Sequence, residues 1–243
     1  MIYFQFNTLV YVYIITIILL IVFCVYLLYE STDINQHNRT IEKDGYVVFE
    51  HTNKENVLNR LPKGYDFLDY RYEIKGCTLS TFHRDVTSSQ YIFKTKHPVY
   101  TYIVYNNNGP LLSVCPNSHK MTPFLFSKPY IIHGKENTAI LFNCDIVHAG
   151  AMNNFGNKRN LIQYKICHDD DRHILENLNK IHYIHTEKCR NTKGYEYVCR
   201  KISLCFSFII NHVFVKLLQE KPEKDSAFDQ ILNILHIGKF YNK

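Results

Sequence analysis

The sequence predicts a mainly β domain, a sandwich or a barrel, behind an apolar N-terminal helix. Several segments between residues 45 and 167 are short, rich in β-branched and aromatic residues, and bounded by Gly, Pro, Asn or Asp, as strands are. No helical pattern separates them, which favours a sandwich or barrel over a parallel α/β sheet. The chain begins differently, with a long apolar run that carries no charge. We therefore expect a β core with flanking helices and one apolar helix before it.

The size and composition of the chain fit one compact domain with appendages. Its 243 residues lie between one and two typical domain lengths of about 150 residues. Hydrophobic residues make up 46% and charged residues 21%, which excludes disordered, collagen-like and coiled-coil classes for most of the chain. The net charge of +6 comes without a dense run of Lys and Arg, so we expect no nucleic-acid partner. The oligomeric state stays open.

The segment Thr8–Tyr29 has the pattern of a transmembrane helix. It contains no charged residue, Gly or Pro, and as a helix it would extend roughly 33 Å. Tyrosines near both ends suit the two membrane interfaces. A cleaved signal peptide would have a shorter apolar stretch and small residues at its cleavage site. We therefore expect residues 1–30 to be a retained single-pass anchor that contacts the membrane through residues 8–29.

The orientation of this anchor is predicted less sharply. No Lys or Arg precedes the apolar run, whereas Arg39 and Lys43 follow it, which favours a cytosolic main domain. Seven of the eight cysteines lie outside the anchor, and this odd, unpatterned set is typical of reduced thiols. The triplet Asn38-Arg39-Thr40 is a glycosylation sequon that matters only in a lumen, so the orientation stays open.

The rest of the chain divides into three parts. Residues 31–40 are polar and predict a tether, residues 41–171 predict the β domain, and residues 172–243 predict a mainly helical extension. Within the extension, Ile202–Leu218 is mostly apolar. A helix packed on the β domain or on the membrane face is favoured there over a second span. Contact of this segment with the membrane stays open. Helices are also expected at His173–Lys180 and Ser226–Ile237.

The strand pattern is clearest in the last expected strand. There Ile162, Tyr164 and Ile166 alternate with Gln163, Lys165 and Cys167, the period-2 pattern of a strand with one buried face. The expected strands are Gly45–Glu50, Tyr72–Phe82, Val99–Tyr105, Leu111–Cys115, Thr138–Asn143 and Asn160–Cys167.

One group of residues after the β domain has some features of a zinc site. His182 and His185 lie near Cys189 and Cys199, but the ten-residue separation of the two cysteines fits no common zinc spacing. A disulfide between the two cysteines is the alternative if the domain is lumenal. Zinc binding therefore stays open.

A second group of residues has the composition of an iron site. His83-Arg84-Asp85 is a His-x-Asp triplet, His148 follows after several expected strands, and Arg159 opens the last strand. Two His and one carboxylate can occupy one face of Fe(II), which leaves three positions for a chelating cosubstrate and dioxygen. An Arg on a neighbouring strand offers a planar fork for a distant carboxylate. A second triplet, His168-Asp169-Asp170, lacks this context, because its next histidines follow too soon for strands to intervene.

Four stretches between residues 40 and 168 carry a family resemblance. They are Asp44–Val48, His83–Asp85, Gly109–Lys120, and His148–Asn153 followed by Arg159. Together they resemble the phytanoyl-CoA dioxygenase-like family of Fe(II)/2-oxoglutarate-dependent oxygenases. The resemblance implies a double-stranded β-helix, or jelly-roll, core for residues 41–171. It also implies Fe(II) held by His83, Asp85 and His148, 2-oxoglutarate bound by Arg159, and dioxygen as the oxidant, with ascorbate left open as an auxiliary reductant.

The chain departs from the family pattern at two positions. Asn117 replaces the usual Gly of a Pro-Gly-Ser-His turn, which is tolerable because Asn accepts a positive φ better than most residues. Gly150 stands where relatives often place a hydroxyl near the 2-oxoglutarate carboxylate. Another donor is then needed, and we expect it to be Tyr102 or Tyr105. His119 is expected to hold its own turn beside the pocket.

The sequence therefore predicts a membrane-anchored 2-oxoglutarate-dependent dioxygenase that hydroxylates an unidentified substrate and releases succinate and CO2. The anchor favours a lipid, an acyl chain or a membrane-associated molecule as that substrate. A catalytically inactive jelly roll that serves as a binding or scaffold protein is the alternative. A type II membrane glycosyltransferase shares the order of anchor, tether and domain. We find neither a nucleotide-binding α/β pattern nor an acidic metal motif that would support it.

Overall fold

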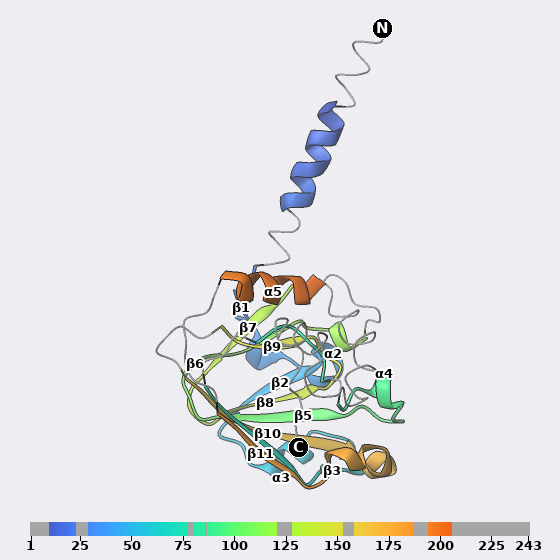
Figure 1. Cartoon of the computed structure of the whole chain (residues 1–243). Helices are drawn as coiled ribbons and strands as arrows, with labels where there is room; N and C mark the ends of the chain where they lie inside the picture. The colour runs from blue at the N-terminus through green and yellow to red at the C-terminus, as the bar shows by residue number, and fades with distance from the viewer. Residues whose placement is uncertain are drawn as a thin grey trace, which may run out of the picture.

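The described part of the chain forms two β-sheets packed face to face (Figure 1). The computed structural model describes residues 10–22, 29–76, 80–85, 87–120, 128–152, 158–186 and 194–205. The larger, seven-stranded sheet contains β2 (Tyr46–Glu50), β3 (Tyr65–Phe67), β4 (Tyr70–Gly76), β5 (Tyr100–Tyr105), β8 (Thr138–Asn143), β10 (Arg159–His168) and β11 (Ile181–Thr186). The four-stranded sheet contains β1 (Ser31–Thr32), β6 (Gly109–Val114), β7 (Tyr130–Gly134) and β9 (His148–Gly150).

The connections between the sheets are consistent with a jelly roll. In the larger sheet β4, β10, β5 and β8 are antiparallel neighbours in that order, and in the smaller sheet β7, β6 and β9 are. The chain passes from β5 to β6 and β7, back to β8, across to β9 and back to β10, so it alternates between the sheets. An antiparallel bridge between His83 and His148 extends the smaller sheet beyond β9. This double-sheet arrangement is that of a jelly roll, and the prediction of a mainly β fold is confirmed.

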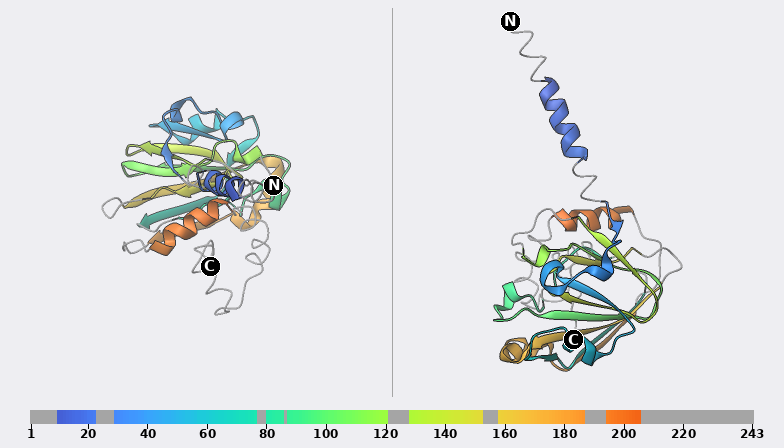
Figure 2. Two further views of the ribbon diagram at one scale, coloured as in Figure 1. Left: turned by 90° about the horizontal axis from the view of Figure 1, so that it is seen from above. Right: turned by 180° about the vertical axis from the view of Figure 1, so that it is seen from behind.

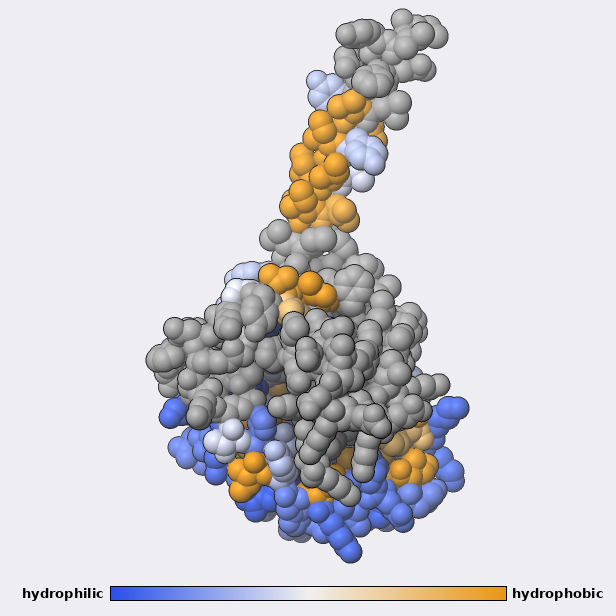
Figure 3. Space-filling view, in the orientation of Figure 1, coloured by the Kyte–Doolittle hydropathy of each residue, from blue (hydrophilic) through white to orange (hydrophobic). Residues whose placement is uncertain are grey.

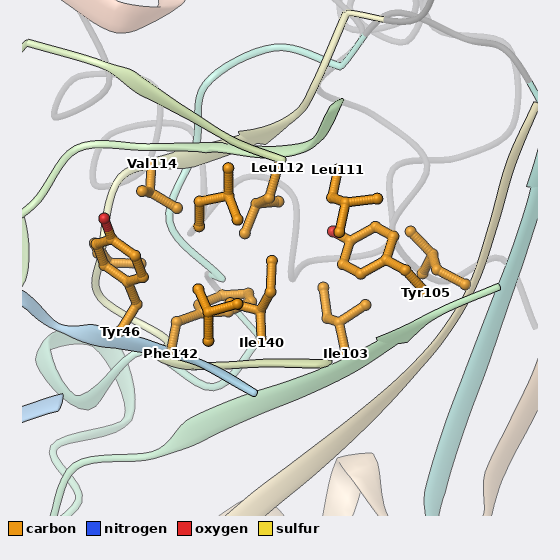
Figure 4. Close-up of a cluster of buried hydrophobic side chains, with 12 residues drawn as sticks. Tyr46, Ile103, Tyr105, Leu111, Leu112, Val114, Ile140 and Phe142 are labelled. Carbon is orange, nitrogen blue, oxygen red and sulfur yellow. The ribbon is translucent and has the colours of Figure 1, made fainter. Parts of the chain in front are cut away.

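An apolar core fills the space between the two sheets (Figure 4). Side chains from β6 meet side chains from β2, β5 and β8, and a register shift between Pro110 and Leu112 lets both Leu111 and Leu112 join the core. Burial of each large apolar side chain stabilises the fold by roughly 1.5–3 kcal/mol. The cluster consists of Tyr46, Val48, Ile103, Tyr105, Leu111, Leu112, Val114, Ile132, Ile140, Phe142, Ile146 and Leu161.

The two faces of β10 are used differently from the sequence-based expectation. Tyr164 and Ile166, expected on the inner face, pack in a cluster on the outer side of the larger sheet. The buried residues of the other face are Arg159, Leu161, Lys165 and Cys167. Both faces are covered, because the helix α3 (Lys54–Leu58) packs on the outer one. Alternation alone therefore identified the strand but not its inner side.

Short helices cover the sheets and connect the strands. The expected helix His173–Lys180 corresponds to a 3₁₀ segment, η3 (Asp169–Leu178). Two residues of the expected tether, Ser31 and Thr32, form β1 and pair with β7. The segment Ser226–Ile237 and residues 206–218 of the apolar stretch lie outside the described residues. The other short elements are η1 (Gln36–Asn38), α2 (Ile41–Asp44), α4 (Gln90–Phe93) and η2 (Ser118–Lys120).

The helix α5 (Gly194–Cys205) covers the outer face of the smaller sheet, as the views of Figure 2 show. Its Leu204 packs on Phe82, Cys115, Val147 and Ala149, and the Ser203 hydroxyl accepts a hydrogen bond of 2.8 Å from the Phe82 backbone N–H. The described start of the predicted Ile202–Leu218 helix thus packs on the β domain.

Arg200 of α5 joins five segments of the chain in one buried contact. Its Nε and Nη2 bind the two carboxylate oxygens of Glu30 at 3.0 and 2.7 Å. Nη2 also donates to Ser113 Oγ at 2.9 Å, and Nη1 donates to the backbone oxygens of Ser80 and Gly150. These five contacts match the five N–H groups of a guanidinium, and Arg200 is 0% exposed. Glu30 and α5 are therefore parts of the β domain's packing.

The predicted membrane anchor is corrected by the structure. Residues 10–22 form a helix whose apolar side chains are exposed (Figure 3). Among the described residues no helix is both long and apolar enough to span a bilayer. The prediction of a single-pass membrane protein was therefore wrong; residues 1–9 and 23–28 lie outside the described part.

Candidate metal centre

His83, Asp85 and His148 converge from two distant parts of the chain. The backbones of His83 and His148 exchange two hydrogen bonds of 2.9 Å, which sets their rings side by side with centroids 4.5 Å apart. Oδ1 of Asp85 lies 3.8 Å from Nε2 of His83 and 3.5 Å from Nε2 of His148. One ligand atom from each of the three residues lies within 4.8 Å of the others. The three side chains can therefore hold one metal ion.

The two imidazoles are oriented by backbone carbonyl groups. Nδ1 of His83 lies 2.8 Å from the Thr81 oxygen, and Nδ1 of His148 lies 3.0 Å from the Ile146 oxygen. A carbonyl only accepts, so each Nδ1 carries the proton and each Nε2 keeps a free lone pair toward Asp85. Burial, together with the neighbouring His148, lowers the pKa of His83 to about 4, so this ring is neutral at neutral pH.

Asp85 is the anionic member of the group. Its Oδ2 accepts hydrogen bonds from Thr101 Oγ1 at 2.5 Å and from Lys165 Nζ at 2.6 Å, which leaves Oδ1 toward the histidines. Burial alone would raise the pKa of Asp85, but the charge of Lys165 outweighs it and holds the pKa well below its usual value. The carboxylate is therefore ionised over the physiological range.

This donor set fits a divalent transition metal. Two neutral imidazole nitrogens and one carboxylate oxygen on one side of a site form the facial triad of non-haem Fe(II) oxygenases, with the remaining positions open. Mg²⁺ and Ca²⁺ prefer oxygen ligands and fit it poorly. The sequence-predicted residues His83, Asp85 and His148 are thus the ones that the fold brings together.

Arg159 and Gly150 lie against each other beside this group. Arg159 begins β10 and is 6% exposed, and Gly150 ends β9, the strand that His148 begins. A Cβ added at Gly150 would overlap Nη1 of Arg159. The guanidinium therefore occupies the space that a side chain at position 150 would fill, which explains in physical terms why this chain has Gly there.

Of the two tyrosines proposed from the sequence, Tyr105 lies in the interior between the sheets (Figure 4). Its hydroxyl is buried and has no hydrogen-bond partner in the described part of the chain. Burial raises its pKa, and the charge of Arg159 opposes that shift. Tyr102 is three residues away and projects to the other face, where it packs with Phe67 and Tyr164. Tyr105 is thus the better placed hydroxyl donor.

We expect Gly150→Ala to weaken 2-oxoglutarate binding about tenfold with little loss of stability. The added methyl displaces the end of the flexible Arg159 side chain and leaves the strand in place. The measurement is the 2-oxoglutarate KM or Kd together with the melting temperature. An unchanged affinity would contradict the placement of Arg159 as the carboxylate-binding residue.

Two neighbouring expectations concern the turn at residues 116–119. Asn117 has a φ of 67°, the left-handed conformation for which Asn is the natural replacement of Gly. His119 packs against Gly45, whose φ of 86° and lack of Cβ make room for the ring. His119 therefore contacts the residue before β2, and its role in holding the turn stays a prediction.

The possible zinc ligands are not assembled among the described residues. His182 and His185 are three positions apart on β11, so their side chains leave the strand on opposite faces. His182 binds Asp69 at 2.7 Å, and His185 stacks on Tyr72. Cys199 is a free thiol, and Cys189 lies outside the described residues.

The second His-x-Asp triplet does meet another histidine. His97 stacks on His168 with ring centroids 3.8 Å apart and an interplanar angle of 26°, and Asp170 lies 3.5 Å from His97. The lone pairs of an imidazole lie in its ring plane, so two nearly parallel rings cannot aim at one ion without turning. The group suits a metal less well than the buried centre does.

Sequence reasoning missed one residue of the metal centre, Lys165. It is 0% exposed, and its ammonium bonds the ligand Asp85. The available signal was its position: Lys165 lies an even number of residues after Arg159 on the same strand, so both project to the same side.

Comparison with known proteins shows similarity in structure only. No protein-family model and no curated protein sequence matches the chain. Among solved structures the chain is similar to EvdMO1 (14% identity, TM-score 0.37), with 46% of this chain and 30% of EvdMO1 covered. It is also similar to the iron and α-ketoglutarate-dependent endoperoxidase NvfI, at 8% identity and a TM-score of 0.39 over 57% and 83% of the two chains.

A third similar structure is HygX from Streptomyces hygroscopicus with nickel and 2-oxoglutarate bound. The identity is 12% and the TM-score 0.38, with 52% of this chain and 83% of HygX covered. At these values the likenesses assign the chain to no family.

Proposed function

We propose that this protein is an Fe(II)- and 2-oxoglutarate-dependent dioxygenase. The observation that carries the proposal is the convergence of His83, Asp85 and His148, with both Nε2 atoms directed toward the ionised carboxylate. The resemblance to the phytanoyl-CoA dioxygenase-like family agrees with this proposal. Membership of that particular family is part of what we propose.

The cosubstrate assignment rests on Arg159 and Tyr105. A guanidinium presents a planar pair of N–H donors that matches a carboxylate, and a buried hydroxyl next to it offers a further donor. The distal carboxylate of 2-oxoglutarate fits these two groups, while its keto-acid end suits the open positions of the metal.

Each residue of the candidate site has a defined role in this mechanism. When bound, Fe(II), 2-oxoglutarate and dioxygen together supply the oxidising power for hydroxylation, with succinate and CO2 as co-products. His83 and His148 would hold the ion through Nε2, while their Nδ1 protons stay on the Thr81 and Ile146 backbone oxygens. Asp85 supplies the negative charge, Arg159 and Tyr105 orient the cosubstrate, and the apolar core around Phe142, whose ring lies 4.6 Å from that of His148, excludes water.

The argument for a lipid or membrane-associated substrate no longer holds. A lipid or membrane-associated substrate was favoured because of the predicted anchor, and that anchor is corrected by the structure. The proposal therefore names the reaction and not the substrate.

The test of this function is anaerobic loading of the full chain with Fe(II), followed by addition of 2-oxoglutarate, oxygen and ascorbate. We expect succinate to form slowly even without a substrate, and only when Fe(II), 2-oxoglutarate and oxygen are all present. The inactive binding protein, the alternative function, would bind metal and 2-oxoglutarate without forming succinate. Absence of metal binding would contradict both.

We expect Arg159→Lys to raise the KM for 2-oxoglutarate roughly tenfold or more with a smaller change in kcat. Lysine keeps the charge but replaces the planar fork by a point charge, so the bidentate contact with the distal carboxylate is lost. Steady-state succinate formation at varied 2-oxoglutarate measures this effect. A wild-type KM in the variant would remove Arg159 from the cosubstrate site.

A further inference from the structure

The metal centre contains a buried positive charge that its three ligands do not require. Lys165 projects inward from β10 and is 0% exposed. Its Nζ lies 2.6 Å from Asp85 Oδ2, 2.8 Å from Thr101 Oγ1 and 3.0 Å from Ser88 Oγ. The three oxygens can accept the three N–H bonds of an ammonium, so the group is built to hold the charged form.

This ammonium changes the charge that an arriving metal ion meets. Asp85 is the single anion among the three ligands, and Lys165 neutralises it through its second oxygen. The ligands together with Lys165 therefore carry a formal charge of zero, whereas a two-His, one-carboxylate set alone carries −1. A divalent ion in the site then keeps its full charge of +2 toward the next ligand.

The same contact restricts how Asp85 binds metal. Oδ2 is held by Lys165 and Thr101, so only Oδ1 faces the histidines. Coulomb repulsion between an ammonium and a divalent ion weakens binding of the ion, and attraction between the more positive site and a dianion strengthens binding of the dianion. Both effects are large because Lys165 is excluded from water.

We propose that Lys165 is a positioning residue that sets the balance between the affinity for the metal and the affinity for the cosubstrate. It weakens metal binding to the free protein, and it strengthens binding of dianionic 2-oxoglutarate to the metal-loaded protein. The proposal rests on the proposed function, and it makes stable metal occupancy depend on the presence of the cosubstrate.

The test uses Lys165→Met, which removes the charge and keeps a similar volume. Co(II) serves as a redox-stable probe and is titrated into the full-length apoprotein without oxygen. 2-Oxoglutarate is then titrated into the Co(II)-loaded protein. We expect the Co(II) affinity to rise about tenfold or more, and the 2-oxoglutarate affinity to fall by a similar factor.

The matched control is Ser88→Ala, which removes one acceptor of Lys165 and leaves its charge. We expect both affinities in this variant to stay within about threefold of wild type. Far-UV circular dichroism and a melting temperature report whether each variant folds. If Lys165→Met does not fold, Lys165→Gln gives the same comparison, because its amide donates to Asp85 without a charge.

The outcomes separate this inference from the function on which it rests. A wild-type protein that binds neither Co(II) nor 2-oxoglutarate contradicts the proposed function. A wild-type protein that binds both, with variants at position 165 in which both affinities fall or neither changes, leaves the function standing and overturns the role of Lys165. A residue that only supported the fold would lower both affinities together.

Discussion

His83→Ala is expected to lower metal affinity at least a hundredfold and to abolish 2-oxoglutarate turnover. Loss of a residue that merely orients a ligand typically costs about 10–100-fold, so loss of a ligand itself costs more. The His83 side chain is 17% exposed, and its removal leaves no buried charge without a partner. Co(II) titration and succinate formation measure the two effects, with a melting temperature to confirm folding.

The matched control for this experiment is His182→Ala. His182 is a histidine whose side chain is 63% exposed and which binds Asp69 on the surface of the domain. We expect its metal affinity and turnover to equal those of the wild type. Turnover retained in His83→Ala would contradict the ligand assignment.

Asp85 requires a substitution other than alanine. Asp85→Ala would leave the buried Lys165 ammonium without its carboxylate, and breaking such a pair typically costs about 3–5 kcal/mol of stability. Lost activity in that variant would not separate misfolding from loss of a ligand. Asp85→Asn keeps a hydrogen-bond acceptor for Lys165 and is the better variant.

Arg200→Ala is expected to lower the free energy of unfolding by about 3 kcal/mol. The substitution leaves the Glu30 carboxylate, which is 2% exposed, with its contacts to Lys201 and Ser113 but without its buried ion pair. It also removes the donors to the Ser80 and Gly150 backbone oxygens. For a chain of this size the melting temperature should fall on the order of 10 °C. Denaturant unfolding of both proteins at neutral pH measures the difference.

Lys201→Ala is the matched control, since Lys201 binds the same carboxylate at 2.9 Å but is 27% exposed. Its removal should cost less than about 1 kcal/mol, as for other partly solvated ion pairs. Equal losses in the two variants would contradict the view that buried pairing with Arg200 provides most of the stabilisation.

The same contact predicts a dependence of stability on pH. Burial would raise the pKa of Glu30, but the hydrogen bonds and charge of Arg200 lower it from 4.5 to about 2. A depressed pKa in the folded state stabilises the fold above pH 4.5, and this stabilisation is lost as the pH falls from 4.5 toward 2. Arg200→Ala should therefore lose stability less steeply over that range than the wild type.

The N-terminal segment shows what a hydropathy pattern does not predict. An uncharged apolar run of the right length predicted a membrane span, yet no helix among the described residues is long and apolar enough to cross a bilayer. Hydropathy reports how favourably a segment leaves water. Whether the segment forms a membrane-spanning helix is a separate property, which hydropathy does not contain.

The sequence by itself determined the mainly β fold and the residue types of the candidate site. The His-x-Asp triplet, the later His and the following Arg are visible because they lie in a fixed order along expected strands. These are local properties, since the period of a strand and the chemistry of a side chain belong to short segments.

Only the tertiary structure decided which face of each strand points inward and which charged side chains form pairs. It placed Lys165 on Asp85 across 80 positions and Arg200 on Glu30 across 170 positions, and it turned Tyr105 inward and Tyr102 outward. The physical reason is that a strand presents two faces with equal regularity. Which face becomes the interior depends on distant segments that pack on each side, as α3 does on the outer face here.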